Sequence, residues 1–316
     1  MELTKKKPVS LKKNGRHIKR TPEDVVLDAV IYLSLILLCV VTLYPFLNTL
    51  AISFNSALDT VRGGIYLWPR EITLRNFEKI LVGNPAITQA LFISASRAVV
   101  GCATAVFACL CVSYVLSRRE FVLRRVFTPF LVFTMYFSGG LIPVYLLMGD
   151  LHLTNNFLVY ILPGMVGAYN VMVMRSYIES LPESLIEAAK IDGASEYRIL
   201  FAIIWPLSLP VVATIALFVA VGQWNSWFDT MLYCSNPKAG LTTLQYELQK
   251  LLTSAQSYSG QDSDAALATG DLNKVPVTPS SIRAAMTIIA VVPILFIYPF
   301  LQKYFVTGLT LGGVKG

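Results

Sequence analysis

The sequence predicts an all-α, polytopic membrane protein with six transmembrane helices. Of its 316 residues, 55% are hydrophobic and only 14% are charged, whereas about a quarter of the residues in soluble domains are charged. The mean hydropathy is +0.60. The hydrocarbon core of a bilayer needs about 20 apolar residues per helix. The apolar runs at 29–47, 98–116 and 199–221 approach or exceed that length, so they fit a membrane better than a soluble core.

Apolar segments of this kind divide the chain into three parts. A basic tail at 1–24 precedes a transmembrane domain at 25–301, and a second tail follows at 302–316. The predicted spans are 25–47, 86–116, 126–148, 156–174, 199–221 and 284–301. Among the prolines in these spans, Pro210 and Pro293 are expected to kink their helices.

Charge sets the expected orientation. Eight Lys and Arg residues precede the first span, and an even number of spans returns the C-terminus to the same side. That side carries 17 of the 26 Lys and Arg residues, against eight on the other side. Cytoplasmic loops are enriched in Lys and Arg, so both termini are predicted to be cytoplasmic in a multi-pass cell-membrane protein. The basic tail is expected to meet anionic lipid rather than nucleic acid.

Catalytic chemistry has few residues to work with in this sequence. Four of the five cysteines lie in apolar runs, and His17 and His152 are the only histidines. No metal-ligand spacing occurs, so no metal is predicted. A phosphate-binding Gly-x4-Gly-Lys-Ser/Thr motif is also missing, and the deep apolar runs carry almost no ionisable residue. The sequence thus predicts a transport subunit that is not an enzyme and is driven from outside the chain.

The connection at 180–205 is too polar to span a membrane and lies on the predicted cytoplasmic side. Ser180 and Glu183 match a capping box, which predicts a helix that begins at about Pro182 and runs over Glu183–Ile191. Gly193 is expected to end this helix, since a glycine permits the tight turn.

Glu187, Ala188 and Ala189 are followed after three residues by Gly193, and later by Ile203 and Pro206. This order resembles the EAA loop of type I ABC importer permeases, with Trp205 as a departure from the usual leucine. The resemblance implies a type I permease fold, in which this loop is a coupling helix that docks on a separate ATPase. The coupling residues that it implies are Glu187, Ala188, Ala189, Asp192 and Gly193. The two alanines are expected to form a small surface that enters a cleft on the ATPase.

Other segments extend the resemblance to the carbohydrate-uptake, MalG-like branch of these permeases. They are 222–229 at the end of the fifth span, the C-terminal 308–316, and 137–143, which is similar to a subgroup associated with oligosaccharides from complex polysaccharides. The resemblance implies an oligosaccharide importer that works by alternating access. Its expected partners are a second, homologous permease in a heterodimer, a cytosolic ATPase dimer that uses ATP and Mg, and an extracytoplasmic binding protein.

Aromatic and amide side chains are the usual contacts for sugars, and both gather at the end of the fifth span. The candidates for a sugar path are Gln223, Trp224, Asn225, Trp227, Tyr136 and Asn170. An interfacial aromatic belt is the alternative interpretation for Trp227 and Phe228.

The outer connection at 229–280 contains leucines at helical spacing. Leu241, Leu244, Leu248 and Leu251 predict an amphipathic helix. The Ser-, Gly- and Asp-rich segment 254–273 is expected to be a mobile loop. Three functional alternatives stay open: an ABC permease for a non-sugar solute, an ion-coupled secondary transporter and a membrane-embedded enzyme.

Overall fold

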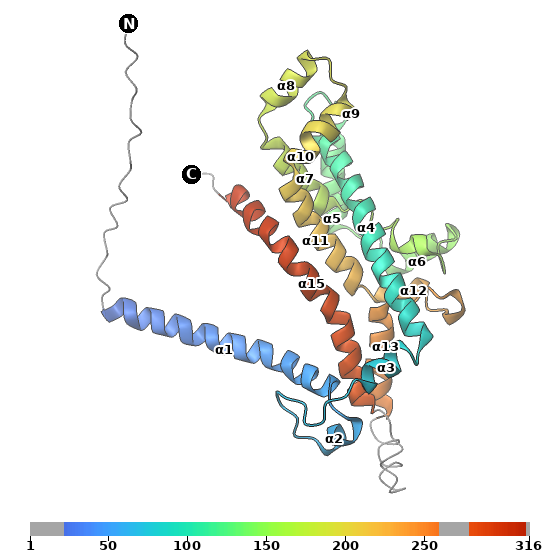
Figure 1. The fold of residues 1–316 in the computed structure, drawn as a ribbon. Helices are drawn as coiled ribbons and strands as arrows, with labels where there is room; N and C mark the ends of the chain where they lie inside the picture. Colours follow the sequence, from blue (N-terminus) through green and yellow to red (C-terminus); the bar gives the residue numbers. More distant parts are fainter. Residues whose placement is uncertain (1–21, 259–277, 314–316) are drawn as a thin grey trace. The chain divides into compact units, whose positions relative to one another are not determined.

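The structure is a computed structural model that describes residues 22–258 and 278–313 (Figure 1). Apart from an isolated β-bridge between Asn55 and Ile72, its regular elements in these residues are helices. The chain divides into two units, residues 1–48 and 49–316, and each is described by itself. The all-α prediction is confirmed.

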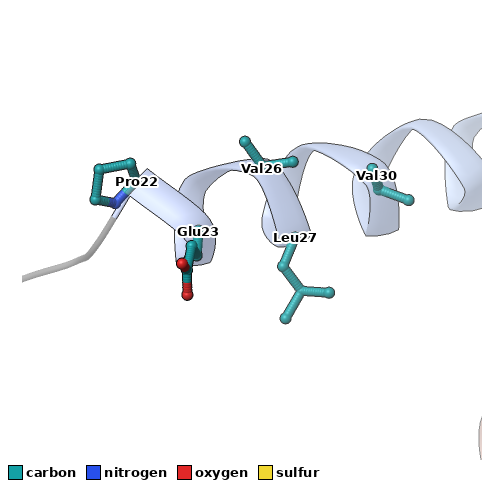
Figure 2. A pocket seen from close by; sticks show the side chains of 5 residues that line it. All are labelled: Pro22, Glu23, Val26, Leu27 and Val30. Atoms are coloured by element: carbon teal, nitrogen blue, oxygen red, sulfur yellow. The ribbon is translucent and has the colours of Figure 1, made fainter.

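The described part of the first unit, 22–48, lies entirely in helix α1 (Pro22–Ser53). Pro22 occupies the first helical position, where its missing N–H has no helical partner to lose, and Glu23 and Asp24 favour the positive end of the helix dipole. Figure 2 shows a shallow surface pocket over the first turns, lined by Val26, Leu27 and Val30 next to Pro22 and Glu23. A helix that is apolar on every side is typical of a membrane span.

In the second unit, helix α4 (Pro85–Ser117) is the central element. It packs against α7 (Ala168–Glu179) and α11 (Leu209–Asn225), and α11 in turn packs against α15 (Pro279–Gly313). Figure 1 shows α4, α11 and α15 as long neighbouring helices. The largest buried cluster joins α4, α7 and α11 through residues such as Leu110, Met174 and Ile215.

Two predicted spans are bent rather than straight. The predicted span 126–148 is split into α5 (Arg124–Tyr136) and α6 (Leu141–Asp150), which meet at 115°. The fifth span begins with α9 (Glu196–Ile199), a π-helical segment η2 (Leu200–Ile204) and α10 (Trp205–Leu207), then turns by 79° into α11. The second bend falls next to Pro210, where a kink was predicted, because proline lacks the N–H that would continue the helix.

The prediction of one continuous helix over 156–174 is wrong. A short 3-10 helix, η1 (Phe157–Tyr160), is followed by non-helical chain up to Gly167, and α7 begins at Ala168. Pro163, Gly164 and Gly167 account for the interruption, since proline lacks a donor and glycine weakens a helix. In the described residues, three helices and the two bent pairs are long and apolar enough to cross a membrane. Helix α7, in the fourth predicted span, is shorter.

The last helix is longer than the sequence predicted. Helix α15 continues past the expected end of the span at 301 and reaches Gly313. The described part of the predicted C-terminal tail, 302–313, is therefore helical. The predicted basic tail lies outside the described residues as far as 21, and its last three residues belong to α1.

Helix α8 (Glu183–Ile191) lies at one end of the second unit, and short helices form the other end, as Figure 1 shows. They are α2 (Ala57–Arg62), α3 (Arg75–Leu81), α12 (Phe228–Tyr233), η3 (Pro237–Ala239) and α13 (Leu244–Tyr258). Asn55 fixes this region locally, because its side-chain amide donates to Asp59 at 3.0 Å and accepts from the backbone N–H groups of Arg70 and Glu71. The hydrogen bond from Asn55 lowers the pKa of the Asp59 carboxyl.

The predicted amphipathic helix is α13, although it begins at Leu244 rather than Leu241. Leu244 and Leu248 are buried in a cluster with Ile80 and Met286, whereas Leu251 packs at its margin. The helix also includes the first five residues of the predicted mobile loop, 254–258. The rest of that loop, 259–273, lies outside the described residues.

Candidate functional site

Helix α8 stands at one end of the second unit, next to α9 (Figure 1). Its bounds are those that the sequence predicted. Ile186 and Ala189, three residues apart, face the core and are buried, whereas Glu187 and Ala188 are exposed. The expectation that both alanines form an outer surface is therefore wrong for Ala189. Ala189 shares the buried face with Ile186, which is three residues away, whereas Ala188 is rotated by about 100° from Ala189 and lies on the exposed side.

The turn after α8 is built as the sequence predicted. Gly193 has φ +73°, and its N–H donates to the carbonyl of Lys190 at 3.0 Å. The N–H of Ala194 donates to the carbonyl of Ala189 at 2.9 Å. These two bonds form a Schellman motif, in which the left-handed residue is usually glycine. Asp192 is the residue just before it, and it is exposed.

The predicted capping box is absent from the start of α8. The Ser180 hydroxyl donates to the carbonyl of Tyr177 at 2.6 Å, so it belongs to the end of α7. Pro182 precedes the first helical residue and offers no side-chain cap. The helix starts at the expected place because Pro182 ends the preceding turn, and the N–H of Leu185 donates to its carbonyl at 3.2 Å.

Ion pairs join α8 to its neighbours. The Lys190 ammonium lies 2.7 Å from the Glu120 carboxylate, in the loop between α4 and α5, and 3.2 Å from Glu196 on α9. Arg119 in the same loop lies 3.7 Å from Glu183. The hydrogen bond to Glu120 raises the pKa of Lys190. Exposed pairs stabilise a fold by less than about 1 kcal/mol each, so they mainly orient α8 against the loop.

A different polar cluster lies between the far end of α4 and the end of α11. We call Arg97, Tyr160, Gln223 and Asp229 the Arg97 cluster. The Arg97 side chain is only 2% exposed, and its guanidinium donates to Gln223 Oε1 at 2.9 Å and to Asp229 Oδ1 at 3.2 Å. It also lies 4.3 Å from the centre of the Tyr160 ring. Each of the three guanidinium nitrogens of Arg97 thus donates to an acceptor within the chain.

Gln223 is held at both ends of its amide. Its oxygen accepts from Arg97, and its Nε2 donates to the backbone carbonyl of Tyr160 at 3.1 Å. Gly101, one turn along α4 from Arg97, makes room for it, because a Cβ at that position would lie 2.9 Å from Gln223 Nε2. Arg97 and Asp229 are 132 residues apart in the chain, so no local signal in the sequence pairs them.

Trp224 also has a packing role. Its ring is buried, and the indole N–H donates to the carbonyl of Ala290 on α15 at 2.9 Å. Asn225 is exposed and makes one long contact, 3.4 Å, with Gln245. Trp227 is half-buried and packs edge-to-face on Phe228 with ring centres 5.7 Å apart.

The two remaining candidates lie on other elements. Tyr136 ends α5 and is 79% exposed, whereas Asn170 is half-buried in the first turn of α7, close to Gly167. The six sugar-path candidates therefore lie on α5, on α7 and at the end of α11 and the start of α12. In the residues that the structure describes, no three His, Cys, Asp or Glu side chains come together in a way that could hold a metal.

Comparison with known proteins gives a consistent result. Residues 87–310 match the family described as binding-protein-dependent transport system inner membrane component. The polygalacturonan/rhamnogalacturonan transport system permease protein YtcP of Bacillus subtilis is 33% identical, over 92% of this chain and 98% of that protein. Protein LplC of the same organism is 35% identical, over 87% of this chain and 90% of its own.

A solved structure agrees with these relatives. A chain in the crystal structure of a bacterial ABC transporter involved in the import of the acidic polysaccharide alginate superposes with a TM-score of 0.80. It is 28% identical, and the match covers 90% of this chain and 99% of that one.

Proposed function

Because this chain belongs to the family of binding-protein-dependent transport system inner membrane components, we propose that it is the permease subunit of an ABC importer for an oligosaccharide derived from a complex polysaccharide. The observation that carries the proposal is the near full-length similarity to YtcP, a polygalacturonan/rhamnogalacturonan permease protein. The structural similarity to a chain of an alginate importer supports the same class of substrate.

Helix α8 is the proposed docking element for the ATPase. Glu187 and Ala188 are exposed on it, Ile191 is 86% exposed just beyond them, and Asp192 and Gly193 close the turn. On the opposite face, Ile186 and Ala189 are anchored in the core that contains α4, α7 and α11. A push on the exposed face therefore acts on a helix that is packed into the transmembrane core.

The proposal includes an energy source and partners outside this chain. ATP and Mg belong to a cytosolic ATPase dimer, because this sequence has no phosphate-binding motif of its own. An extracytoplasmic binding protein delivers the sugar, and a second homologous permease completes the pathway as a heterodimer. The Lys and Arg residues of the N-terminal tail and of the predicted inner connections support a cytoplasmic location for both termini and α8.

In the proposed mechanism, closure of the ATPase dimer moves α8 together with α9 and the α4–α5 loop. Ile186 and Ala189 of α8 and Ile199 of α9 share one buried cluster, and Lys190 orients α8 against the loop and α9 through Glu120 and Glu196. The pathway opens outward in this state, and ATP hydrolysis resets it. Asn225, Trp227, Tyr136 and Asn170 are the side chains that we assign to the sugar path. Gln223 and Trp224 are assigned a packing role next to the path and no direct sugar contact, since their polar atoms are hydrogen-bonded within the chain.

Reconstituted uptake tests the proposal. The chain is assembled in proteoliposomes with its second permease, its ATPase and its binding protein, and offered labelled oligogalacturonides and rhamnogalacturonan fragments. ATP-dependent uptake of either is expected. Uptake without ATPase, driven by a proton or sodium gradient, contradicts the proposal. ATP-dependent uptake of a non-sugar solute alone keeps the transporter class and overturns the substrate.

A further inference from the structure

The junction between α5 and α6 interrupts a membrane span with exposed backbone. We call residues 137–140 the α5–α6 break. The two helices meet there at 115°, and all four residues are exposed. Gly140 has φ +89° and ψ 170°, a conformation that only glycine adopts readily. The conformation of Gly140 is thus a local cause of the break that needs no packing partner.

The break lies at membrane depth. Helix α5 has 13 residues and begins with Arg124 and Arg125, which need water or lipid head groups. At 1.5 Å per residue the helix rises about 20 Å, which is less than the roughly 30 Å of a hydrocarbon core. The helix therefore ends before it has crossed the membrane.

Backbone polar groups are left open at this depth. In the described chain, the N–H groups of Ser138 and Gly139 have no acceptor, and the carbonyls of 137–139 have no donor. Each such group costs several kcal/mol in hydrocarbon, so irregular backbone is tolerated only inside protein or along a water-filled path. Apart from its two chain neighbours, no atom of the described second unit lies within 4 Å of the position that a Cβ on Gly139 would take, so this unit leaves Gly139 uncovered.

We propose that the α5–α6 break lines the aqueous sugar pathway and that the neighbouring Tyr136 ring packs against passing sugar rings. The inference rests on the proposed function for its ligand. Tyr136 is 79% exposed, and Phe137 stacks on Phe133 with ring centres 4.2 Å apart. An oligosaccharide matches this surface, because sugar rings have an apolar face for an aromatic ring and hydroxyls for free backbone groups.

Thiol labelling in the assembled transporter tests the location of the break. Ser138→Cys is compared with Phe130→Cys, which lies on the regular part of α5 and is also exposed in this chain. A membrane-impermeant thiol reagent is expected to label Ser138→Cys at least tenfold faster, above the background of the unsubstituted chain. Equal, slow labelling of both variants means that lipid or another subunit seals the break, which overturns the proposal.

Substitution of Tyr136 tests the sugar contact separately. Tyr136→Leu is expected to lower the maximal uptake rate at least fivefold while labelling at Ser138→Cys stays fast, and Tyr136→Phe is expected to restore most of the rate. An unchanged rate in Tyr136→Leu overturns the role of the ring. Labelling needs no sugar, so its failure is distinguishable from a failure of the proposed function, which would appear as lost uptake of polysaccharide fragments by the unsubstituted transporter.

Discussion

The α8 end and the Arg97 cluster are both polar, but they are built in opposite ways. Around α8, the charges are exposed and pair across a loop, as Lys190 does with Glu120. In the Arg97 cluster, one guanidinium is buried and its donors are taken up by Gln223, Ser226 and Asp229. Exposed pairs contribute little energy and can be replaced by water. Breaking a buried pair by removing one member leaves a charge that nothing compensates.

This contrast indicates different functions for the α8 end and the Arg97 cluster. The exposed ion pairs around α8 can be exchanged for water or for groups of another protein. This suits a surface to which a partner binds reversibly. The Arg97 cluster fixes α4, η1, α11 and α12 to one another, which suits a rigid wall. Substitutions at the first end are expected to change transport with the fold intact, and those at the second to damage the fold itself.

Arg97→Met is expected to have the largest effect. It removes the partner of Asp229 and leaves the Gln223 oxygen without a donor, at a cost of about 3–5 kcal/mol for a broken buried pair. The yield of monodisperse protein and its thermal unfolding temperature in detergent measure this loss. The double variant Arg97→Met/Asp229→Leu should lose less, because both charges are gone. Equal stability of Arg97→Met and the unsubstituted chain would falsify the wall assignment.

Leu244→Asp is expected to have the second largest effect. The Leu244 side chain is fully buried beside Met286 and Trp224, so a carboxylate there costs several kcal/mol or forces α13 away from the core. Uptake and membrane level are both expected to fall. Gln249→Glu on the more open side of α13 is the matched control and should be neutral.

Deleting part of 259–273 should leave transport largely intact. If the deletion stops uptake and Leu244→Asp does not, that segment, and not α13, is the part of the outer connection that transport requires.

Gly193→Leu and Glu187→Lys are expected to stop uptake without preventing insertion. A leucine at φ +73° costs about 1–2 kcal/mol of backbone strain, although its Cβ meets no atom within 4 Å. The fold survives and the turn after α8 shifts. Gly193→Asn is the control, since asparagine tolerates this conformation. Uptake and co-purification of the ATPase are the readouts. Normal transport by both variants, with the ATPase retained, contradicts the docking role of α8.

Lys190→Met should have the smallest effect on stability. The pairs with Glu120 and Glu196 are partly exposed, so their loss is expected to change the free energy of unfolding by less than about 1 kcal/mol. Because Glu120 raises the pKa of Lys190, the pair stabilises the fold below the ordinary lysine pKa, down to the pH at which the carboxylates become protonated. That contribution is lost as the pH rises above the ordinary lysine pKa of about 10.4 and through the raised one. Melting curves across this range measure it, with Lys190→Arg as control; a large loss at neutral pH contradicts the comparison.

Some of the site could be predicted because its causes are local. The bounds of α8 follow from Pro182 before it and Gly193 after it, and these residues act on their own backbone. The capping box at Ser180 was a wrong local prediction, since a hydroxyl can serve the end of one helix as readily as the start of the next. The split between Ala188 and Ala189 was also missed, although the helical period puts Ala189 on the same face as the apolar Ile186 three residues before it.

The sequence by itself determined the helical membrane class, the approximate spans and the α8 turn, because hydrophobic length and backbone preference need no distant partner. Only the tertiary structure decided how Gln223 and Trp224 are used. Arg97 lies 126 residues from Gln223 and 132 from Asp229 in the chain, and Trp224 meets a carbonyl 66 residues away. No local pattern encodes such meetings. They arise where α4, α11 and α15 pack, because a polar group buried there must find a partner.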